Sequence, residues 1–133
     1  MRKLSHFINH AFTAETSSDY FELISPVSGE VYALSPQAGQ AEVDAAYDAA
    51  HAAFRIWKKT TPSQRQRALL QLADAIEDNA DKIITVQSQE TGQLRHFIRQ
   101  EEIIASCDTL RFFAGAARCM EGKNSGEYLP DMN

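Results

Sequence analysis

The pattern of hydrophobic and polar residues changes near Ala41 and divides the chain into a strand-rich part and a helical part. Before this point, the segments FINHAF (7–12) and YFELIS (20–25) are short and rich in aromatic and β-branched residues, which is typical of strands. Pro26 and Gly29 stand at turn spacing between YFELIS and EVYALSP (30–36). The sequence therefore predicts a hairpin over residues 20–35.

After Ala41, apolar residues recur at helical spacing, and four helices are predicted. The first runs from Ala41 to about Lys59, with an apolar face that includes Val43, Phe54 and Trp57. The third covers ADKIITVQSQET (80–91) and is closed by Gly92.

The second and fourth helices have clear boundary signals. Thr61 is predicted as the N-cap of the second helix, with Pro62 in the first helical position and Gln64 three residues after the cap. Asn79 breaks this helix, whose predicted apolar face consists of Leu69, Leu72, Ala73 and Ile76. The fourth helix is predicted from His96 to about Met120, ended by Gly122.

The predicted fold class is therefore mainly α with a small N-terminal antiparallel β portion. Residues 1–40 form a strand and turn segment, residues 41–122 a helical segment, and residues 123–133 the start of an extended segment. A chain of 133 residues is one domain at most.

Composition narrows the class of protein. Hydrophobic residues make up 44% and charged residues 23% of the chain, as in soluble globular proteins. The formal net charge of −5 argues against a nucleic-acid-binding surface. No apolar run has the length of a membrane span, and no signal peptide is evident. We expect no nucleic-acid partner, no membrane association and a cytoplasmic location with reduced thiols.

The two cysteines, Cys107 and Cys119, are the first candidates for chemistry. Twelve positions along one predicted helix are about 18 Å of rise, too far for a disulfide between them. Cys119 as a nucleophile would need a nearby base, whereas no histidine is close to it in the sequence. A half-buried helix thiol is the favoured interpretation for Cys119, and Cys107 is predicted to be in the core.

Other candidate motifs carry little signal. His6 and His10 are four residues apart in a predicted strand, which favours a surface pair over a metal site. The adjacent carboxylates Glu101 and Glu102 point in different directions on a helix and form no acid–base pair, although one of them could face a cleft. The chain contains no phosphate-binding glycine loop and no set of zinc ligands.

The order of the motifs along the chain is more specific than any one of them. A turn with Pro26, Gly29 and Glu30 precedes an alanine-rich helix that ends in Trp57. The sequence then shows TTPSQRQRALL (60–70), ETG (90–92) and FFAG (112–115). This succession resembles the N-terminal part of the NAD(P)-dependent aldehyde dehydrogenases, and RFFAGAARCMEGKNSGEYLP (111–130) is similar to the betaine-aldehyde and aminobutyraldehyde branch. The chain departs from the family pattern at four positions: His10, Ser25, Ser28 and Gln93.

The resemblance implies the N-terminal part of the α/β aldehyde dehydrogenase fold, with residues 41–122 in the cofactor-binding domain. It implies an oxidoreductase that converts an aldehyde, such as an aminoaldehyde or betaine aldehyde, to the acid with NAD or NADP. The catalytic cysteine and glutamate of the family lie beyond this chain, so Cys119 is not the family nucleophile. We therefore expect an N-terminal fragment or truncated gene product that is inactive and binds no cofactor by itself.

Two groups of site residues follow from the resemblance. Acidic residues at the start of the last helix line the substrate entrance in the aminoaldehyde branch. Glu102 matches one such position and Ala105 another, and helical spacing puts Ser106 on the same face. A monovalent cation site of the family corresponds to the backbone carbonyls of Leu23 and Ile24 and the carboxylate of Glu90.

A second hypothesis remains open from the sequence: a stand-alone helical module that binds itself or another protein. We expect the isolated chain to self-associate, as a dimer or larger oligomer, because the helices carry more large apolar residues than they can cover. An exposed edge in GEYLP (126–130) would add to this tendency.

Overall fold

The structure is a computed structural model that describes residues 1–13 and 19–121 of the chain. The chain forms two compact units, Met1–Lys59 and Thr60–Asn133, and each is described by itself below. The first long helix therefore groups with the strands, although the hydrophobic pattern changes near residue 41. The segments predicted to end the last helix and to start an extended strand, Gly122 and residues 123–133, lie outside the described residues.

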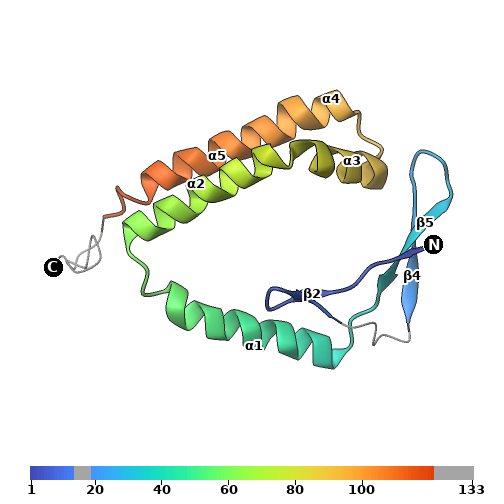
Figure 1. Ribbon diagram of the computed structural model, residues 1–133, viewed down its shortest axis with the longest axis horizontal. Coiled ribbons are helices and arrows are strands. Elements are labelled where there is room, and N and C mark those ends of the chain that lie inside the picture. The colour runs from blue at the N-terminus through green and yellow to red at the C-terminus, as the bar shows by residue number, and fades with distance from the viewer. Residues whose placement is uncertain (14–18, 122–133) are drawn as a thin grey trace. The chain divides into compact units, whose positions relative to one another are not determined.

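The first unit contains a three-stranded sheet and a separate two-stranded hairpin (Figure 1). The strands β4 (Tyr20–Ile24) and β5 (Val31–Pro36) pair antiparallel, which confirms the predicted hairpin. β1 (Arg2–Lys3) pairs parallel with the other edge of β5, a pairing that the sequence did not predict. β2 (Phe7–Ile8) and β3 (Ala11–Phe12) form the second antiparallel pair.

The turn between β2 and β3 consists of Asn9 and His10, both of which have positive φ angles of 52° and 63°. A two-residue turn of this type requires positive φ at both central positions, which glycine and asparagine tolerate best. His10 stands where the family pattern has glycine, so the hairpin forms in spite of a side chain that disfavours this conformation.

The turn between β4 and β5 shows what the two serine departures do. Ser25 Oγ accepts hydrogen bonds of 3.3 Å from the backbone N–H groups of Val27 and Ser28. Ser28 Oγ accepts one of 3.3 Å from the N–H of Glu30. Gly29 has a φ of 74°, in the left-handed region that favours glycine. The serines therefore provide the side-chain acceptors that hold this turn.

The helix α1 (Gln40–Trp57) ends the first unit. At its N-terminus the N–H of Gly39 donates to the carboxylate of Glu42 at 2.9 Å. None of its residues is buried, and the predicted apolar residues Val43, Phe54 and Trp57 are exposed. The predicted helix is confirmed, whereas its apolar face is not covered.

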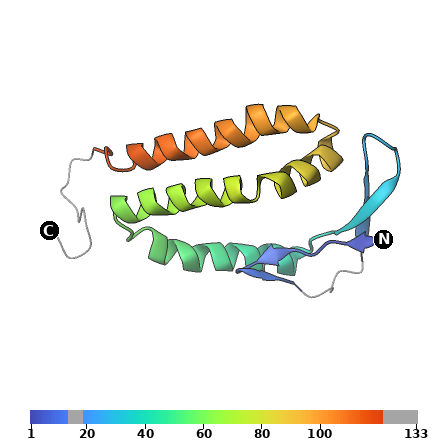
Figure 2. The ribbon, with the colours of Figure 1, turned by 45° about the horizontal axis from the view of Figure 1, so that its top comes forward.

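The second unit is a layer of helices. It consists of α2 (Pro62–Asp78), α3 (Ala80–Thr91), α4 (Arg95–Phe97), the π-helical segment η1 (Ile98–Ile103) and α5 (Ile104–Ala116). Figure 2 shows α2 and α5 side by side. Thr61 caps α2 as predicted, accepting from the N–H of Gln64 at 3.3 Å, and Gly92 closes α3 with a φ of 74°. No helix in the described part of the chain is long and apolar enough to cross a bilayer.

The core of this unit lies between α2, α3 and the last helix. Its buried members are Ala73, Ala80, Ile84, Ile98, Ile103 and Cys107. The prediction of Cys107 as a core residue is confirmed. Leu72 was predicted on the apolar face of α2 but is 48% exposed. Successive helical positions are about 100° apart, and α2 packs against the core through the adjacent Ala73, so Leu72 is turned away from it.

The predicted fourth helix is not a regular α-helix over its length. Ile98 and Ile103 are both buried although five positions along an α-helix lie about 140° apart around its axis. The wider π turn of η1, with its i to i+5 spacing, brings both side chains to the core. The helix also ends at Ala116 rather than near Met120, because Arg118 and Cys119 donate to the carbonyls of Gly115 and Ala116 in tight turns.

Candidate functional site

The most connected polar group of the second unit surrounds Glu102 in η1. The side-chain N–H of Gln93 donates to Glu102 Oε1 at 2.9 Å, and Gln87 Nε2 donates to Glu102 Oε2. Gln87 Nε2 also donates to Gln93 Oε1 at 2.9 Å, so the three side chains form a closed ring. We call Gln87, Gln93 and Glu102 the Glu102 cluster. Glu102 is half-buried, whereas its neighbour Glu101 is exposed.

The local folding of the chain brings this cluster together. Gln87 lies on α3, one turn before the end of the helix, and Gln93 follows the left-handed Gly92 that closes it. The chain then reverses into α4 and η1, where Glu102 faces back toward α3. The sequence predicted Glu102 as a site residue and missed both glutamines. The departure at Gln93 was the only sequence signal of this arrangement.

The other two predicted entrance residues lie directly after the cluster. Ala105 and Ser106 are on the first turn of α5, and both are exposed. Ile103, between them and Glu102 in the sequence, is buried. The side chain of Glu102 and the exposed start of α5 are thus available for recognition, and their role at a substrate entrance stays a prediction.

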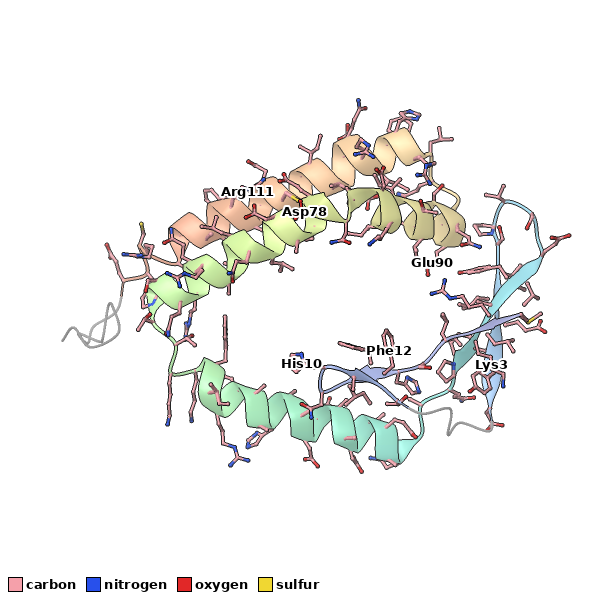
Figure 3. All side chains as sticks on the ribbon, viewed as in Figure 1. Lys3, His10, Phe12, Asp78, Glu90 and Arg111 are labelled. Atoms are coloured by element: carbon pink, nitrogen blue, oxygen red, sulfur yellow. The ribbon has the colours of Figure 1, made fainter. Side chains whose placement is uncertain are left out.

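The residues predicted for a cation site come from the two different units. Leu23 and Ile24 lie on β4, where the register with β5 shifts between them. Glu90 is exposed near the end of α3 (Figure 3) and lines an open hollow of about 530 Å³ with Lys82, Ile83, Val86 and Gln87. Residues 1–13 and 19–121 contain no group of three or more His, Cys, Asp or Glu side chains placed to hold a metal ion.

The two thiols have opposite surroundings. Cys107 is buried and donates to the backbone carbonyl of Ala73 at 3.5 Å. Burial raises the pKa of its thiol, and the nearby Glu77 carboxylate adds to this shift. Cys119 was predicted as a half-buried helix thiol, and this prediction is wrong: the helix ends at Ala116 and Cys119 is exposed. Both cysteines are free, as expected.

The histidines of the first unit do not form a metal site among the described residues. His10 is exposed in the β2–β3 turn, and His6 precedes β2. His6 Nε2 is buried without a hydrogen-bond partner in the part of the chain that the structure describes.

A group of charged residues connects α2 with α5. Arg111 on α5, labelled in Figure 3, is the donor of this group. It donates to Glu77 through two bonds of 2.7 Å and to Asp74 at 3.0 Å. These hydrogen bonds lower the pKa of the Glu77 carboxyl. Both carboxylates are bound to Arg111, so neither is free to act as a base. The group also links α2 to α5.

Comparison with known proteins places these features in a family. The model of the aldehyde dehydrogenase family matches residues 12–131. Acetaldehyde dehydrogenase 2 of Cupriavidus necator is 32% identical over 121 residues, which are 91% of this chain and 24% of that protein. The chain therefore spans about a quarter of the length of this relative.

Solved structures show the same relationship. HpcC from Thermus thermophilus is 32% identical, with a TM-score of 0.81 over 91% of this chain and 24% of its own. The Mycobacterium tuberculosis aldehyde dehydrogenase, complexed with NAD+, is 31% identical, with a TM-score of 0.75 over 87% of this chain and 25% of its own. The fold of the described residues is thus the fold of the corresponding part of these proteins.

Proposed function

The chain belongs to the aldehyde dehydrogenase family, and from this premise we propose that it forms the N-terminal part of an oxidoreductase that oxidises a cationic aldehyde with NAD or NADP. In this proposal the chain provides a helical scaffold and a carboxylate that recognises the substrate. The groups that react with the aldehyde are not among its residues. The proposed substrate class is that of the aminoaldehyde and betaine-aldehyde branch of the family.

The starts of the two longest helices, α1 and α2, do not favour a phosphate group of a nucleotide. The N-terminus of α1, which follows a strand, already has the Glu42 carboxylate bound to the N–H of Gly39. The N-terminus of α2 is closed by the Thr61–Gln64 capping box, in which the N–H of Thr61 donates to Gln64 Oε1 at 2.8 Å. The Glu42 carboxylate at the start of α1 repels a phosphate, and the start of α2 is capped by Thr61, so neither is a favourable phosphate site.

The observation that carries the proposed substrate class is the environment of Glu102. Its carboxylate is half-buried and held by two neutral carboxamides, next to the exposed start of α5. The ion pairs found within residues 1–13 and 19–121 do not include Glu102, so its fixed carboxylate can attract a positively charged group of a ligand. An aldehyde with an ammonium group at its far end would therefore be favoured over a neutral one.

The cation site at Leu23, Ile24 and Glu90 is a separate proposal. Its support is the chemistry of the donors, since backbone carbonyl and carboxylate oxygens are suitable ligands for a hard cation. In the complete enzyme, Na+ or K+ should raise the melting temperature relative to tetramethylammonium chloride of equal ionic strength. Glu90→Gln should remove this difference, and an unchanged difference in the variant would exclude Glu90 as a ligand.

The substrate class is tested by kinetics of the complete enzyme that carries this segment. Glu102→Gln should raise KM for an ammonium-bearing aldehyde about twofold to fivefold relative to a neutral aldehyde of equal length, the size expected for one partly screened charge in water. Asp108→Asn is the control, because Asp108 is an exposed carboxylate on α5, the helix that continues η1. Equal changes in KM for both aldehydes in Glu102→Gln would overturn the proposed class.

A further inference from the structure

The ring of hydrogen bonds around Glu102 holds its carboxylate by both oxygens. Gln93 binds Oε1, Gln87 binds Oε2, and the two carboxamides are also bonded to each other. A carboxylate on a flexible side chain would lose several rotamers on binding a ligand. In the Glu102 cluster these rotamers are already restricted before any ligand arrives.

Gln93 is itself fixed by the end of α3. Its backbone N–H donates to Thr91 Oγ1 at 3.2 Å, and its carbonyl accepts from Ser88 Oγ at 2.8 Å. Thr91 Oγ1 also lies 3.2 Å from Gln93 Oε1. The left-handed Gly92 sets the direction of this segment. Gln93 is thus a fixed part of the helix end, and its carboxamide is directed at Glu102.

Arg95 and Lys82 are hydrogen-bonded to neutral groups and keep their charge, whereas Arg99 pairs with a carboxylate. Arg95 donates to Thr85 Oγ1 at 2.9 Å, and Arg99 pairs with Asp81. Lys82 donates to Asn79 Oδ1 at 3.2 Å. The ion pairs of the described residues do not include Glu102. The donors that hold this carboxylate are neutral amides, which fix its position without pairing with its charge.

We propose that Gln93, supported by Gln87, is a specificity-determining positioning residue that holds the Glu102 carboxylate in place while preserving its charge for a cationic ligand. The inference rests on the proposed function, which assigns Glu102 to substrate recognition. It adds that residue 93 decides whether this charge is available. A cationic side chain at position 93 would pair with Glu102 and lower the preference for cationic aldehydes.

The charge at this site can be measured on the 133-residue chain without any catalysis. Two small nitroxides of similar size, one with an ammonium group and one with a hydroxyl group, are added to the 15N-labelled chain. Paramagnetic relaxation of the Ala105 and Ser106 amides then reports how often each probe visits the surface beside Glu102. The Glu102 carboxylate should favour the cationic probe by about twofold to fivefold.

Three variants separate the possible causes. Gln93→Lys should lower the preference for the cationic probe, and Glu102→Gln should do the same; the exposed carboxylates Glu101 and Asp108 leave a remainder in both variants. Gln71→Lys adds the same charge at an exposed position of α2 and is the matched control; it should leave most of the preference in place. In Glu102→Ala, the side-chain NH2 signals of Gln87 and Gln93 should move to free-amide positions and exchange faster.

The variants test three things separately: the role of Gln93, the role of Glu102 and the formation of the hydrogen-bonded ring. If Glu102→Gln lowers the preference while Gln93→Lys only matches Gln71→Lys, the role of Gln93 is wrong and the proposed substrate class stands. If Glu102→Gln leaves the preference unchanged, Glu102 is not the source of the attraction, and the inference and the substrate class both fall. NH2 signals that stay unchanged in Glu102→Ala would show that the hydrogen-bonded ring does not form.

Discussion

At the scale of single residues, the two thiols show how strongly position decides chemistry. Cys107 lies in the core with a raised pKa, whereas Cys119 is exposed beyond the end of α5. Helical periodicity correctly predicted Cys107 in the core. It misplaced Cys119, because the same periodicity was extended past the residue where the helix ends. Neither Gly115 nor the residues after Ala116 mark the end of the helix clearly enough for it to be predicted from the sequence alone.

The raised pKa of Cys107 predicts a specific loss of stability at alkaline pH. In the unfolded chain the thiol loses its proton above about pH 8.5, whereas the folded core keeps the thiol protonated. The folded state then binds more protons, so its stability falls as the pH rises, by at most about 1.4 kcal/mol per pH unit. Urea unfolding at several pH values should show this slope.

Cys107→Ala should reduce the slope, and Cys119→Ala is the control, because Cys119 is exposed and lies outside the core. An identical pH dependence in the chain and in Cys107→Ala would mean that Cys107 is not protected in the folded state. Comparing slopes rather than absolute stabilities avoids the separate cost of the cavity that Cys107→Ala leaves.

At the scale of elements, local signals decide where the helices begin. Thr61 is buried and its hydroxyl accepts from the N–H of Gln64, so the start of α2 has one specific cap. Thr61→Ala should lower the free energy of unfolding by about 1 kcal/mol, the usual value for a lost N-cap. Thr61→Ser keeps the hydroxyl and should retain most of the stability. Chemical denaturation of the three proteins is the measurement; equal losses in both variants would indicate packing rather than capping.

The elements that the sequence predicted well are those with such local signals. The capping box at Thr61, the break at Asn79 and the closing Gly92 all occur where they were expected. The parallel pairing of β1 with β5 was missed, because a two-residue strand has almost no pattern of its own. The π-helical segment η1 was missed because it follows from packing: it brings Ile98 and Ile103 to one core.

The candidate site was predictable only in part for the same reason. Glu102 was found through the resemblance to the family, since its position in the last helix matched. Gln87 and Gln93 carry no signal as site residues, because glutamines are common on helix surfaces. Their convergence on Glu102 depends on the reversal of the chain after Gly92. The capping glycine and the helical periodicity do not by themselves predict that Gln87, Gln93 and Glu102 come into contact.

At the scale of the whole molecule, the described residues leave many large apolar side chains exposed. In the first unit α1 has no buried residue. In the second unit Ile103 is buried as a core member, while the aromatic pair Phe112 and Phe113 on α5 is exposed. The exposed large residues of the helices are Val43, Tyr47, Phe54, Ile56, Trp57, Leu70, Leu72, Val86, Phe97, Ile104, Phe112 and Phe113.

This exposure supports the expected self-association of the 133-residue chain. Burying one large apolar side chain contributes about 1.5–3 kcal/mol, so burial of many of them together can offset the cost of association. Sedimentation velocity at micromolar concentration should show a dimer or larger species. Phe112→Ser and Phe113→Ser together should shift the chain toward the monomer, with Ser106→Ala as an exposed control on the same helix.

A chain that sediments only as a monomer of 14.8 kDa would contradict this expectation. It would favour the second hypothesis of a stand-alone module with a core that the helices close by themselves. The edge strand predicted in GEYLP (126–130) lies outside the described residues.

The central claim is that these 133 residues provide scaffold and substrate recognition, while the reacting groups belong to other parts of an aldehyde dehydrogenase. The most direct test is the formation of NADH or NADPH by the purified chain with cationic and neutral aldehydes. Thiol titration in the same sample should find Cys119 reactive and Cys107 protected, so that a free thiol is present during the assay. The account predicts no turnover above the protein-free blank. Turnover that disappears in Cys119→Ala would contradict it, because the chain would then contain its own nucleophile.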